Sequence, residues 1–272
     1  MSFGTAIKKT LDIGSNAAYG FWLTLPSAAV AKTILRSCST DPEAGFSWVL
    51  IDAEHGLISD KDYYELTNAI ASEGASPLIR VPWSEEWLIK RALDAGAHGI
   101  VTPMCHSAED AARIVRYSKY PPLGTRGYGP MFATHAIPGV GTAYDAGAAT
   151  GLLVVVQIES KSGVENIEEI TRVEGVDVVF IGPFDLAKQM GVERGGEEHE
   201  AAIQRILNAT KSAGKKAAIF CTDGAQARQR ERDGFDMVSV TTDVGLLGDG
   251  MKHELQAARG FQAIDSLERS GY

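Results

Sequence analysis

Ionisable side chains stand at the ends of several apolar runs, where they are costly unless they are paired or take part in chemistry. One run ends in Asp52-Ala53-Glu54-His55-Gly56, and a second ends in Ile79-Arg80-Val81-Pro82. Two further runs end in Gln157-Ile158-Glu159 and in Gly182-Pro183-Phe184-Asp185. A charged group at the end of an apolar strand loses hydration energy that only a partner or a metal ion restores. Four such ends in one chain indicate a site for proton transfer and cation binding.

Two carboxylates of this set, Glu159 and Asp185, can share one divalent cation. Oxygen ligands suit Mg²⁺, Mn²⁺ or Co²⁺ and leave coordination positions for substrate oxygens and water, but they do not rank the three ions. A zinc site is disfavoured because no Cys or His accompanies these two carboxylates at the ends of their strands. The alternative is structural, with Glu159 capping a helix that begins near Ser162 and Asp185 capping the helix after Gly182. We favour the metal site because both carboxylates occur together.

Arg80 and His55 are the candidates for holding an anionic oxygen and for moving a proton. The guanidinium of Arg80 stays charged at every working pH and binds carboxylate or carbonyl oxygens at fixed geometry. The alternative role for Arg80 is structural, as an ion pair with a carboxylate of the barrel. His55 at a strand end would lie over the cavity as an acid or base, and its alternative is a structural role. The other histidines are expected in loops or at helix edges (His98, His106, His135) and on solvated helix faces (His199, His253).

The turn from Gly182 to Leu186 leads from a strand into a helix, so its backbone amides can accept an anion such as a substrate carboxylate. Gly-x-Gly patterns also occur at Gly127–Gly129 and Gly139–Gly141. Neither follows a strand directly, so no dinucleotide-binding fingerprint is predicted.

Eight apolar runs, each followed by a longer segment with helical spacing, must position these side chains. The near-continuous apolar character of Leu152–Ile158 and Val176–Ile181 is typical of strands covered on both faces. Eight rounds of strand and helix predict a (β/α)8 TIM barrel, with an open doubly wound sheet as the alternative. Active sites of such barrels lie at the C-terminal ends of the strands, where the polar residues stand. The expected strands are Phe21–Pro26, Trp48–Glu54, Ser76–Pro82, Gly99–Met104, Leu152–Glu159, Val176–Ile181, Ala217–Thr222 and Asp236–Thr242.

Helix-start signals and one helical stripe support the same alternation. A serine with an acidic residue three positions later fits a capping box at three places: Ser59 and Asp62, Ser107 and Asp110, Ser162 and Glu165. A stripe with helical spacing predicts one buried face: Ile203, Ile206, Leu207 and Thr210. The long irregular stretch Tyr120–Thr150 is expected to be a functional loop that contains a short helix.

Composition and charge exclude several classes of protein. The 272 residues carry 26 basic and 35 acidic side chains, a net charge of −9, without a basic cluster for nucleic acid or an anionic membrane. Neither a signal peptide nor an apolar stretch of about 20 residues is evident, so a cytoplasmic location is expected. Three widely spaced cysteines suit a reducing compartment and are expected to be small buried hydrophobes.

At these residues the sequence resembles the metal-dependent (class II) 2-oxo-acid aldolases of the HpcH/HpaI family, related to macrophomate synthase and to 2-keto-3-deoxy-sugar-acid aldolases. The resemblance runs from about Gly20 to Gly260. It implies a pyruvate-binding type of barrel over residues 1–258, a tail over 259–272, and a homo-oligomer, a hexamer of three dimers that exchange a C-terminal helix. The matching motifs are Trp48–His55, Leu78–Pro82, Tyr120–Gly127, Gln157–Glu159, and Val173–Asp177 leading into Phe180–Leu186.

The resemblance also implies a reaction and a set of roles. A 4-hydroxy-2-oxo acid or 2-keto-3-deoxy acid would be cleaved reversibly into pyruvate and an aldehyde through a metal-bound pyruvate enolate. Asp94 would orient His55, the acid/base, and this role of Asp94 comes from the resemblance alone. The remaining roles are metal binding by Glu159 and Asp185, contact with the pyruvyl oxygens by Arg80, substrate binding by Gln157, Gly182 and the amides near Phe184 and Asp185, and closure over the distal substrate by Arg126.

Three departures from the family pattern leave the identity of the aldehyde product open. Phe184 is bulkier than the small residue usual at its position, and Met104–Ser107 and Met131–Thr150 match no assigned pattern. Oxaloacetate decarboxylation or an acyl-CoA lyase reaction would use the same metal site, and a non-catalytic anion-binding barrel is a further alternative. A Schiff-base mechanism would need a desolvated lysine, for which Lys161 is the candidate.

Overall fold

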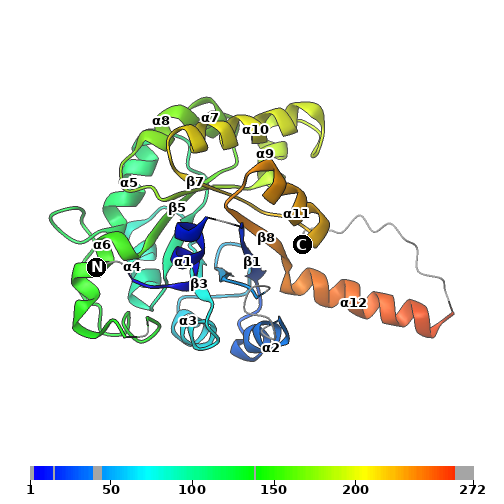
Figure 1. Ribbon diagram of the computed structural model, residues 1–272, viewed down its shortest axis with the longest axis horizontal. Coiled ribbons are helices and arrows are strands. Elements are labelled where there is room, and N and C mark those ends of the chain that lie inside the picture. Colours follow the sequence, from blue (N-terminus) through cyan, green and yellow to red (C-terminus); the bar gives the residue numbers. More distant parts are fainter. Residues whose placement is uncertain (1–2, 15, 39–44, 138, 261–272) are drawn as a thin grey trace.

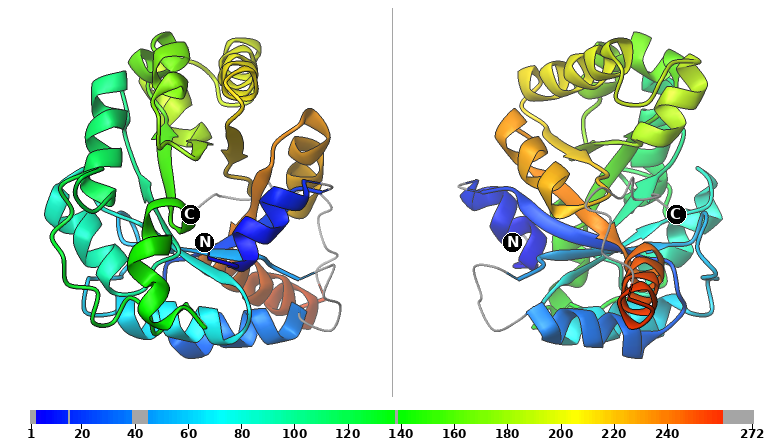
Figure 2. Two further views of the ribbon diagram at one scale, coloured as in Figure 1. Left: turned by 60° about the vertical axis from the view of Figure 1, so that its left-hand side comes forward. Right: turned by 90° about the vertical axis from the view of Figure 1, so that its right-hand side faces the viewer.

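Eight parallel strands close into a barrel in the computed structural model, which describes residues 3–14, 16–38, 45–137 and 139–260. Each strand pairs with the next, and β8 returns to β1 (Figures 1 and 2). The predicted (β/α)8 barrel is therefore confirmed, and the open sheet is excluded. The strands are β1 (Ala18–Leu23), β2 (Trp48–Asp52), β3 (Ser76–Arg80), β4 (Gly99–Thr102), β5 (Leu153–Ile158), β6 (Val178–Ile181), β7 (Lys216–Ile219) and β8 (Met237–Thr242).

Helices surround the barrel as an outer layer (Figure 2). Within the described ranges they are α1 (Ala6–Ile13), α2 (Ala28–Cys38), α3 (Tyr63–Ser72), α4 (Glu86–Asp94), α5 (Ala108–Ser118), the 3-10 helix η1 (Gly141–Ala143), α6 (Tyr144–Gly151), α7 (Lys161–Glu165), α8 (Ile167–Arg172), α9 (Pro183–Met190), α10 (Glu197–Ser212), α11 (Gly224–Asp233) and α12 (Asp243–Ala258). The stripe predicted from Ile203 to Thr210 is buried on α10, and α6 is the short helix expected in the long irregular stretch.

The first strand starts three residues before the predicted boundary of Phe21. Its opening residues are small or polar, so hydrophobicity did not mark them, although Ala18 is fully buried. Gly20 is small because the barrel interior is full at this point. A Cβ there would lie 2.2 Å from the ring of Trp48, far inside van der Waals contact.

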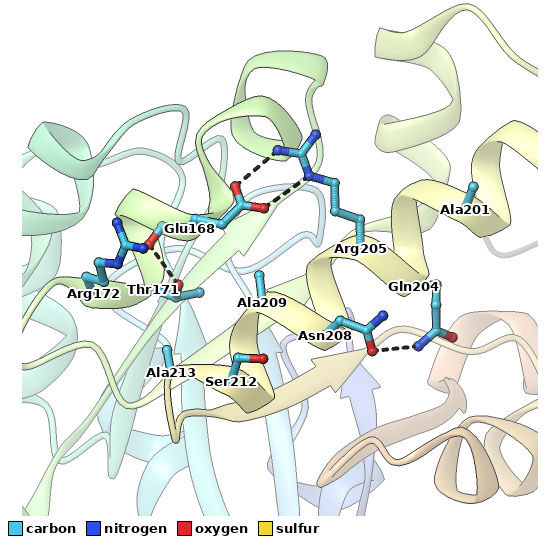
Figure 3. Close-up of a pocket in the computed structure, with 10 residues that line it drawn as sticks. All are labelled: Glu168, Thr171, Arg172, Ala201, Gln204, Arg205, Asn208, Ala209, Ser212 and Ala213. Atoms are coloured by element: carbon cyan, nitrogen blue, oxygen red, sulfur yellow. Dashed lines mark hydrogen bonds and ion pairs between the residues drawn. The ribbon is translucent and has the colours of Figure 1, made fainter.

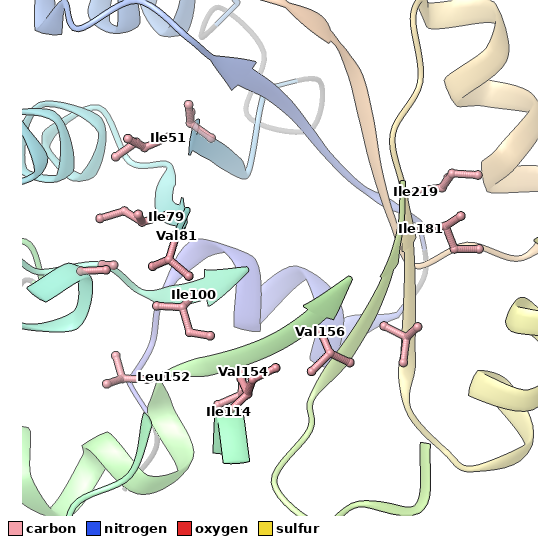
Figure 4. Close-up of a cluster of buried hydrophobic side chains, with 14 of the residues drawn as sticks. Ile51, Ile79, Val81, Ile100, Ile114, Leu152, Val154, Val156, Ile181 and Ile219 are labelled. Carbon is pink, nitrogen blue, oxygen red and sulfur yellow. The ribbon is translucent and has the colours of Figure 1, made fainter. Parts of the chain in front are cut away.

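Side chains alternate along the strands between two separate hydrophobic clusters, as the pleat of a strand requires. The inner cluster fills the barrel and includes Trp48, Leu50, Leu78, Val155 and Phe180. The outer cluster lies between the strands and the helices, and Figure 4 shows part of it, including Ile51, Ile79, Val156 and Ile181. The interior strands are thus covered on both faces, which explains their continuous apolar sequence.

Helix α1, which was not predicted, packs with the inner cluster. Ile7 and Leu11 are buried among the inward-facing residues of the strands, and the amide of Ile7 donates a hydrogen bond to the Ser76 hydroxyl (3.0 Å) at the start of β3. Because Ser76 opens its strand, α1 covers the N-terminal end of the barrel. The opposite, C-terminal end of the barrel is not covered by α1, and this is the end at which an active site is expected.

The three predicted capping boxes have different outcomes. Ser107 caps α5 and accepts from the amide of Asp110, as expected. The cap of α7 is Ser160, two residues before the predicted Ser162, because β5 ends at Ile158 and leaves room for an earlier helix start. At the third place Ser59 donates to the carboxylate of Asp62 in a turn before α3, whose cap makes no side-chain hydrogen bond.

Helix α12 projects away from the barrel (Figure 1). It ends at Ala258, where the barrel domain was predicted to end, and the proposed tail lies outside the described residues from 261 onward. No helix in the described part of the chain is long and apolar enough to cross a membrane. Cys105 and Cys221 are buried, as predicted, whereas Cys38 is partly exposed.

Candidate active site

At the C-terminal end of the barrel, polar residues continue the inward-facing side of three strands, and a glycine continues that of a fourth. In β2 the inward positions Trp48 and Leu50 are followed by Asp52. In β5 the inward positions Leu153 and Val155 are followed by Gln157 and then Glu159. Because inward positions recur every second residue, these polar groups point toward the barrel axis. The remaining members of this layer are Arg80 after Leu78, and Gly182 after Phe180.

Arg80 is held on three sides. Its Nε and Nη2 atoms donate to the carboxylate of Asp52 at 2.9 and 2.8 Å, and its Nη1 lies 2.9 Å from Oε2 of Glu54. The guanidinium also lies over the ring of Trp22, 4.2 Å from the centroid. Its side chain is 1% exposed. The ion pair given as the structural alternative is present, and it fixes the guanidinium at the end of β3 with a defined orientation.

Glu54 is a member of the site that sequence reasoning passed over. Burial raises the pKa of its carboxyl to about 7, against the lowering effect of Arg80, while Asp52 and Asp185 add to the rise. A carboxyl with a pKa near 7 can give or take a proton under physiological conditions. Its position directly before His55 was visible in the sequence, but the elevated pKa follows from burial.

Glu159 lies almost fully buried beside other acidic groups. Its Oε1 accepts from the amide of Met104 at 2.9 Å, and its Oε2 accepts from the side-chain amide of Gln157. Burial raises the pKa of Glu159 to about 7, and the charges of Glu54 and Asp185 contribute to the rise. Gln157 keeps its carbonyl oxygen buried without a hydrogen-bond partner among the described residues. The helix-capping alternative for Glu159 is not observed, because α7 is capped by Ser160.

The backbone closes tightly around Glu159. A Cβ at Gly182 would lie 2.3 Å from Oε2 of Glu159, so only glycine fits at the end of β6. Met104 has a φ of 55°, a left-handed conformation that is uncommon for a residue with a side chain, and it presents its amide to the same carboxylate. Such strain is typical of functional sites.

Asp185 lies in the first turn of α9, which begins with Pro183 at its first position. The first amides of a helix have no acceptor within it and carry partial positive charge, which suits the predicted binding of a carboxylate at Phe184 and Asp185. His199 of α10, predicted to be solvated, is instead buried: its Nε2–H donates to the carbonyl of Pro183 at 2.8 Å. The prediction was wrong because local sequence does not show that α10 packs on this turn.

His55 follows the end of β2 with its imidazole about half exposed, 3.8 Å from Oε1 of Glu54. It lines a cleft of about 660 Å³ together with Phe184 and Asp185. The predicted acid/base residue therefore shares one open space with the predicted metal ligand Asp185 and with the start of α9.

The donor set fits a hard divalent cation. Glu159 and Asp185 supply carboxylate oxygens, and the charge of Asp185 raises the pKa of both Glu159 and Glu54, as acidic groups do when no cation balances them. In the described ranges no group of three or more His, Cys, Asp or Glu side chains could hold a metal ion. A cation held here would therefore take its other ligands from substrate and water, as Mg²⁺ commonly does.

Asp94 and Arg126 pair with each other and not with the residues above. Nη2 of Arg126 donates to Oδ1 of Asp94 at 2.6 Å and to the hydroxyl of Tyr144 at 3.2 Å. Asp94 ends α4, just before β4 starts, so the pair lies toward the N-terminal end of the barrel. The expected pair of Asp94 with His55 does not form within this chain. Arg126 is buried and does not stand in an open loop over the substrate.

Two other places do not compete with this candidate site. Lys161, the Schiff-base candidate, is 73% exposed at the start of α7, so it is not the desolvated lysine that a Schiff-base mechanism needs. A cavity of about 830 Å³ lies between α8 and α10, where Glu168 pairs with Arg205 (Figure 3). Both helices belong to the outer layer, away from the strand ends.

Comparison with known proteins gives a consistent result. The sequence model of the HpcH/HpaI aldolase/citrate lyase family matches residues 19–249. Hydroxypyruvate/pyruvate aldolase of Paraburkholderia phytofirmans is 36% identical over 250 residues, which cover 89% of this chain and 93% of that protein. The 2-keto-3-deoxy-L-rhamnonate aldolase of Salmonella gallinarum is 34% identical over 253 residues, 92% of each chain.

Solved structures show the same barrel. An HpcH/HpaI aldolase/citrate lyase family protein from Burkholderia cenocepacia superposes with a TM-score of 0.84 at 35% identity, over 94% of this chain and 99% of that one. Macrophomate synthase superposes with a TM-score of 0.81 at 22% identity, over 94% of this chain and 88% of that one, a likeness of fold alone.

Proposed function

The chain belongs to the HpcH/HpaI aldolase/citrate lyase family, and from this premise we propose a metal-dependent pyruvate aldolase whose site is the polar layer at the barrel mouth. Its substrate would be a 4-hydroxy-2-oxo acid or 2-keto-3-deoxy acid, cleaved reversibly into pyruvate and an aldehyde. The relatives named as aldolases over most of the chain support carbon–carbon lyase activity. The observation that carries the site assignment is the gathering of Glu54, Glu159 and Asp185, three acidic groups beside a fixed arginine.

A divalent cation held by Glu159 and Asp185 would act as a Lewis acid toward the 2-oxo group of the substrate. Arg80, fixed by Asp52 and Trp22, places positive charge at the barrel axis, where the C2 oxygen gains negative charge as the C3–C4 bond breaks. The amides at the start of α9 bind the substrate carboxylate. Each group is preorganised, so little reorganisation is needed in the transition state.

His55 removes the proton of the C4 hydroxyl, and the electron pair of the C3–C4 bond passes to C3 of the pyruvyl part while the aldehyde forms. The imidazolium that results lies 3.8 Å from Oε1 of Glu54, which stabilises it. C3 then takes up a proton from solvent to give pyruvate, and His55 later returns its own proton to solvent. In the reverse direction His55 returns the proton to the new hydroxyl. The pKa of Glu54, raised to about 7, lets this carboxyl exchange the proton with His55 near neutral pH.

The test is pyruvate release from a panel of 4-hydroxy-2-oxo acids and oxaloacetate, with Mg²⁺, Mn²⁺ or Co²⁺ added back to EDTA-treated protein. We expect cleavage that depends on the added ion and is lost in Glu159→Ala. The matched control is Glu168→Ala, which removes a carboxylate from the exposed pair with Arg205. Ion-independent turnover, or trapping of an imine by borohydride with pyruvate, would overturn the proposal. Carbon dioxide release from oxaloacetate alone would replace it with decarboxylation.

We propose further that the chain is a homo-oligomer whose subunits meet at α12. Among the residues that the structure describes, the helix exposes an apolar stripe of Val244, Leu247, Met251 and Leu255 at helical spacing. An exposed stripe of this kind indicates contact with another protein surface. Light scattering coupled to gel filtration measures the mass, and Leu247→Glu with Met251→Glu is expected to lower it.

A further inference from the structure

The cleft that begins at His55 and Asp185 extends along α9 to the turn after it, and its far end carries positive charge. Beyond the end formed by His55, Phe184 and Asp185, the cleft is lined by Ala187, Lys188, Val192, Glu193 and Arg194. Two cations there face one carboxylate, because Asp185 at the near end is assigned to the metal. With a net charge of −9, the protein as a whole does not attract anions. Positive charge in this cleft is therefore a local feature.

Arg194 lies flat against an aromatic platform. Its guanidinium carbon is 4.3 Å from the centroid of the Phe184 ring, and Phe184 is the residue directly before Asp185. Within the described ranges Arg194 forms no ion pair with a carboxylate. Stacking occupies the face of a guanidinium and leaves its N–H edge directed sideways, where it can bind a carboxylate or phosphate through two parallel hydrogen bonds.

His199 fixes the turn that carries Arg194. The amide of Gly195, the next residue, donates to Nδ1 of His199 at 3.1 Å. Since Nδ1 accepts, the ring hydrogen is on Nε2, which donates to the carbonyl of Pro183. One buried imidazole thus connects the turn at Arg194 with the first residue of the helix that bears Asp185. Arg194 is exposed yet held at a defined place relative to the site.

We propose that Arg194 is a specificity-determining residue that binds an anionic group, a carboxylate or a phosphate, on the aldehyde part of the substrate. This inference rests on the proposed aldolase function and specifies its substrate class. The pyruvyl part is bound at the start of α9 and at the metal, so the distal part of the substrate extends into the cleft past Phe184. Lys188 adds positive charge on the same wall of the cleft. The carboxylate of Glu193 repels any additional negative charge on the substrate that these cations do not balance.

The experiment compares kcat/KM for pyruvate release from three matched 4-hydroxy-2-oxo acids that end in a carboxylate, a phosphate or a neutral hydroxymethyl group. We expect the wild type to favour an anionic substrate. Arg194→Ala should lower the ratio of anionic to neutral kcat/KM about tenfold, mainly through KM, because a charge-assisted hydrogen bond is lost. Arg194→Lys should retain part of the preference. The ranking of carboxylate against phosphate identifies which anion the cleft takes.

Arg172→Ala is the matched control, since Arg172 is an exposed arginine at the end of α8, at the opposite end of the barrel, and its removal should not change the ratio. A wild type without anionic preference would overturn the inference while leaving pyruvate release intact. An equal loss on all three substrates in Arg194→Ala would also overturn it, because that result indicates a structural role. If no acid releases pyruvate with any ion, the proposed function fails and this inference fails with it.

Discussion

Replacing Glu159 with glutamine should stabilise the metal-free protein while removing its activity. The side chain is 2% exposed, and burial together with the charges of Glu54 and Asp185 raises its pKa from 4.5 to about 7. Glutamine has the same shape and can still accept from the amide of Met104. Once the side-chain amide of Gln157 turns over, its carbonyl oxygen, which has no hydrogen-bond partner among the described residues, can accept from the new amide nitrogen. The substitution therefore removes a charge without opening a cavity.

The sign and size of the effect follow from the pKa. A carboxyl whose pKa is raised on folding binds its proton more tightly in the native state, so its stabilising effect is complete below pH 4.5 and is lost as pH rises through 7. The full rise corresponds to roughly 3 kcal/mol. At pH 8 Glu159→Gln should thus raise the free energy of unfolding by about 3 kcal/mol, and at pH 5 by less than about 1 kcal/mol.

The assay is urea denaturation of the EDTA-treated wild type and variant at pH 5, 6, 7 and 8, followed by tryptophan fluorescence. Glu168→Gln is the control, because Glu168 is half exposed and should change stability by less than about 0.5 kcal/mol. Adding Mn²⁺ should stabilise the wild type and not Glu159→Gln. A variant that is no more stable than the wild type at pH 8, or a difference that does not depend on pH, would refute the reasoning.

Three further predictions concern other residues. Burial lowers the pKa of His98 to about 4, and its Nδ1 has no hydrogen-bond partner among the described residues, so a proton gained there would have no acceptor. Protonation of His98 should therefore cost about 2 kcal/mol of stability as pH falls from 7.5 to 5. His98→Leu should remove this part of the pH dependence in urea titrations. Gly182→Ala would place a methyl group 2.3 Å from Glu159, so we expect loss of metal-dependent cleavage and weaker Mn²⁺ binding by calorimetry. His55→Ala should lower kcat for pyruvate release by about 10²- to 10⁴-fold with unchanged thermal stability, and equal turnover would exclude it as the acid/base.

The barrel could be predicted from sequence because its repeating unit is local. Continuous apolar runs such as Leu152–Ile158 mark strands buried on both faces, and the stripe on α10 marks a helix with one buried face. The predicted elements were missed or misplaced where the local hydrophobic pattern gives no signal. One face of α1 and the start of β1 are buried, but small or charged residues dilute their apolar pattern.

The location of the polar candidate residues at the strand ends was predictable for the same reason, whereas pairings between distant elements were not. The pair of Asp94 with Arg126 joins positions 32 residues apart, and nothing in either segment indicates it. His199 appears as a polar residue on a charged helix until α10 is packed on the start of α9. Glu54 requires knowledge of the fold, since its pKa is raised mainly by burial and further by the charges of Asp52 and Asp185.

At the C-terminal end of the barrel, the change from apolar to polar residues occurs on the inward face of the strands only. This pattern distinguishes a candidate functional site from a strand end that is simply exposed to solvent. At the end of a strand that merely meets solvent, residues on both faces would become polar. Here the outward neighbours Ile51, Ile79 and Ile158 remain fully buried hydrophobes, while Asp52 and Arg80 beside them are inward, polar and equally buried. Burying ionisable groups costs stability, and a fold that places them all on the inward side concentrates that cost where a substrate and a cation can offset it.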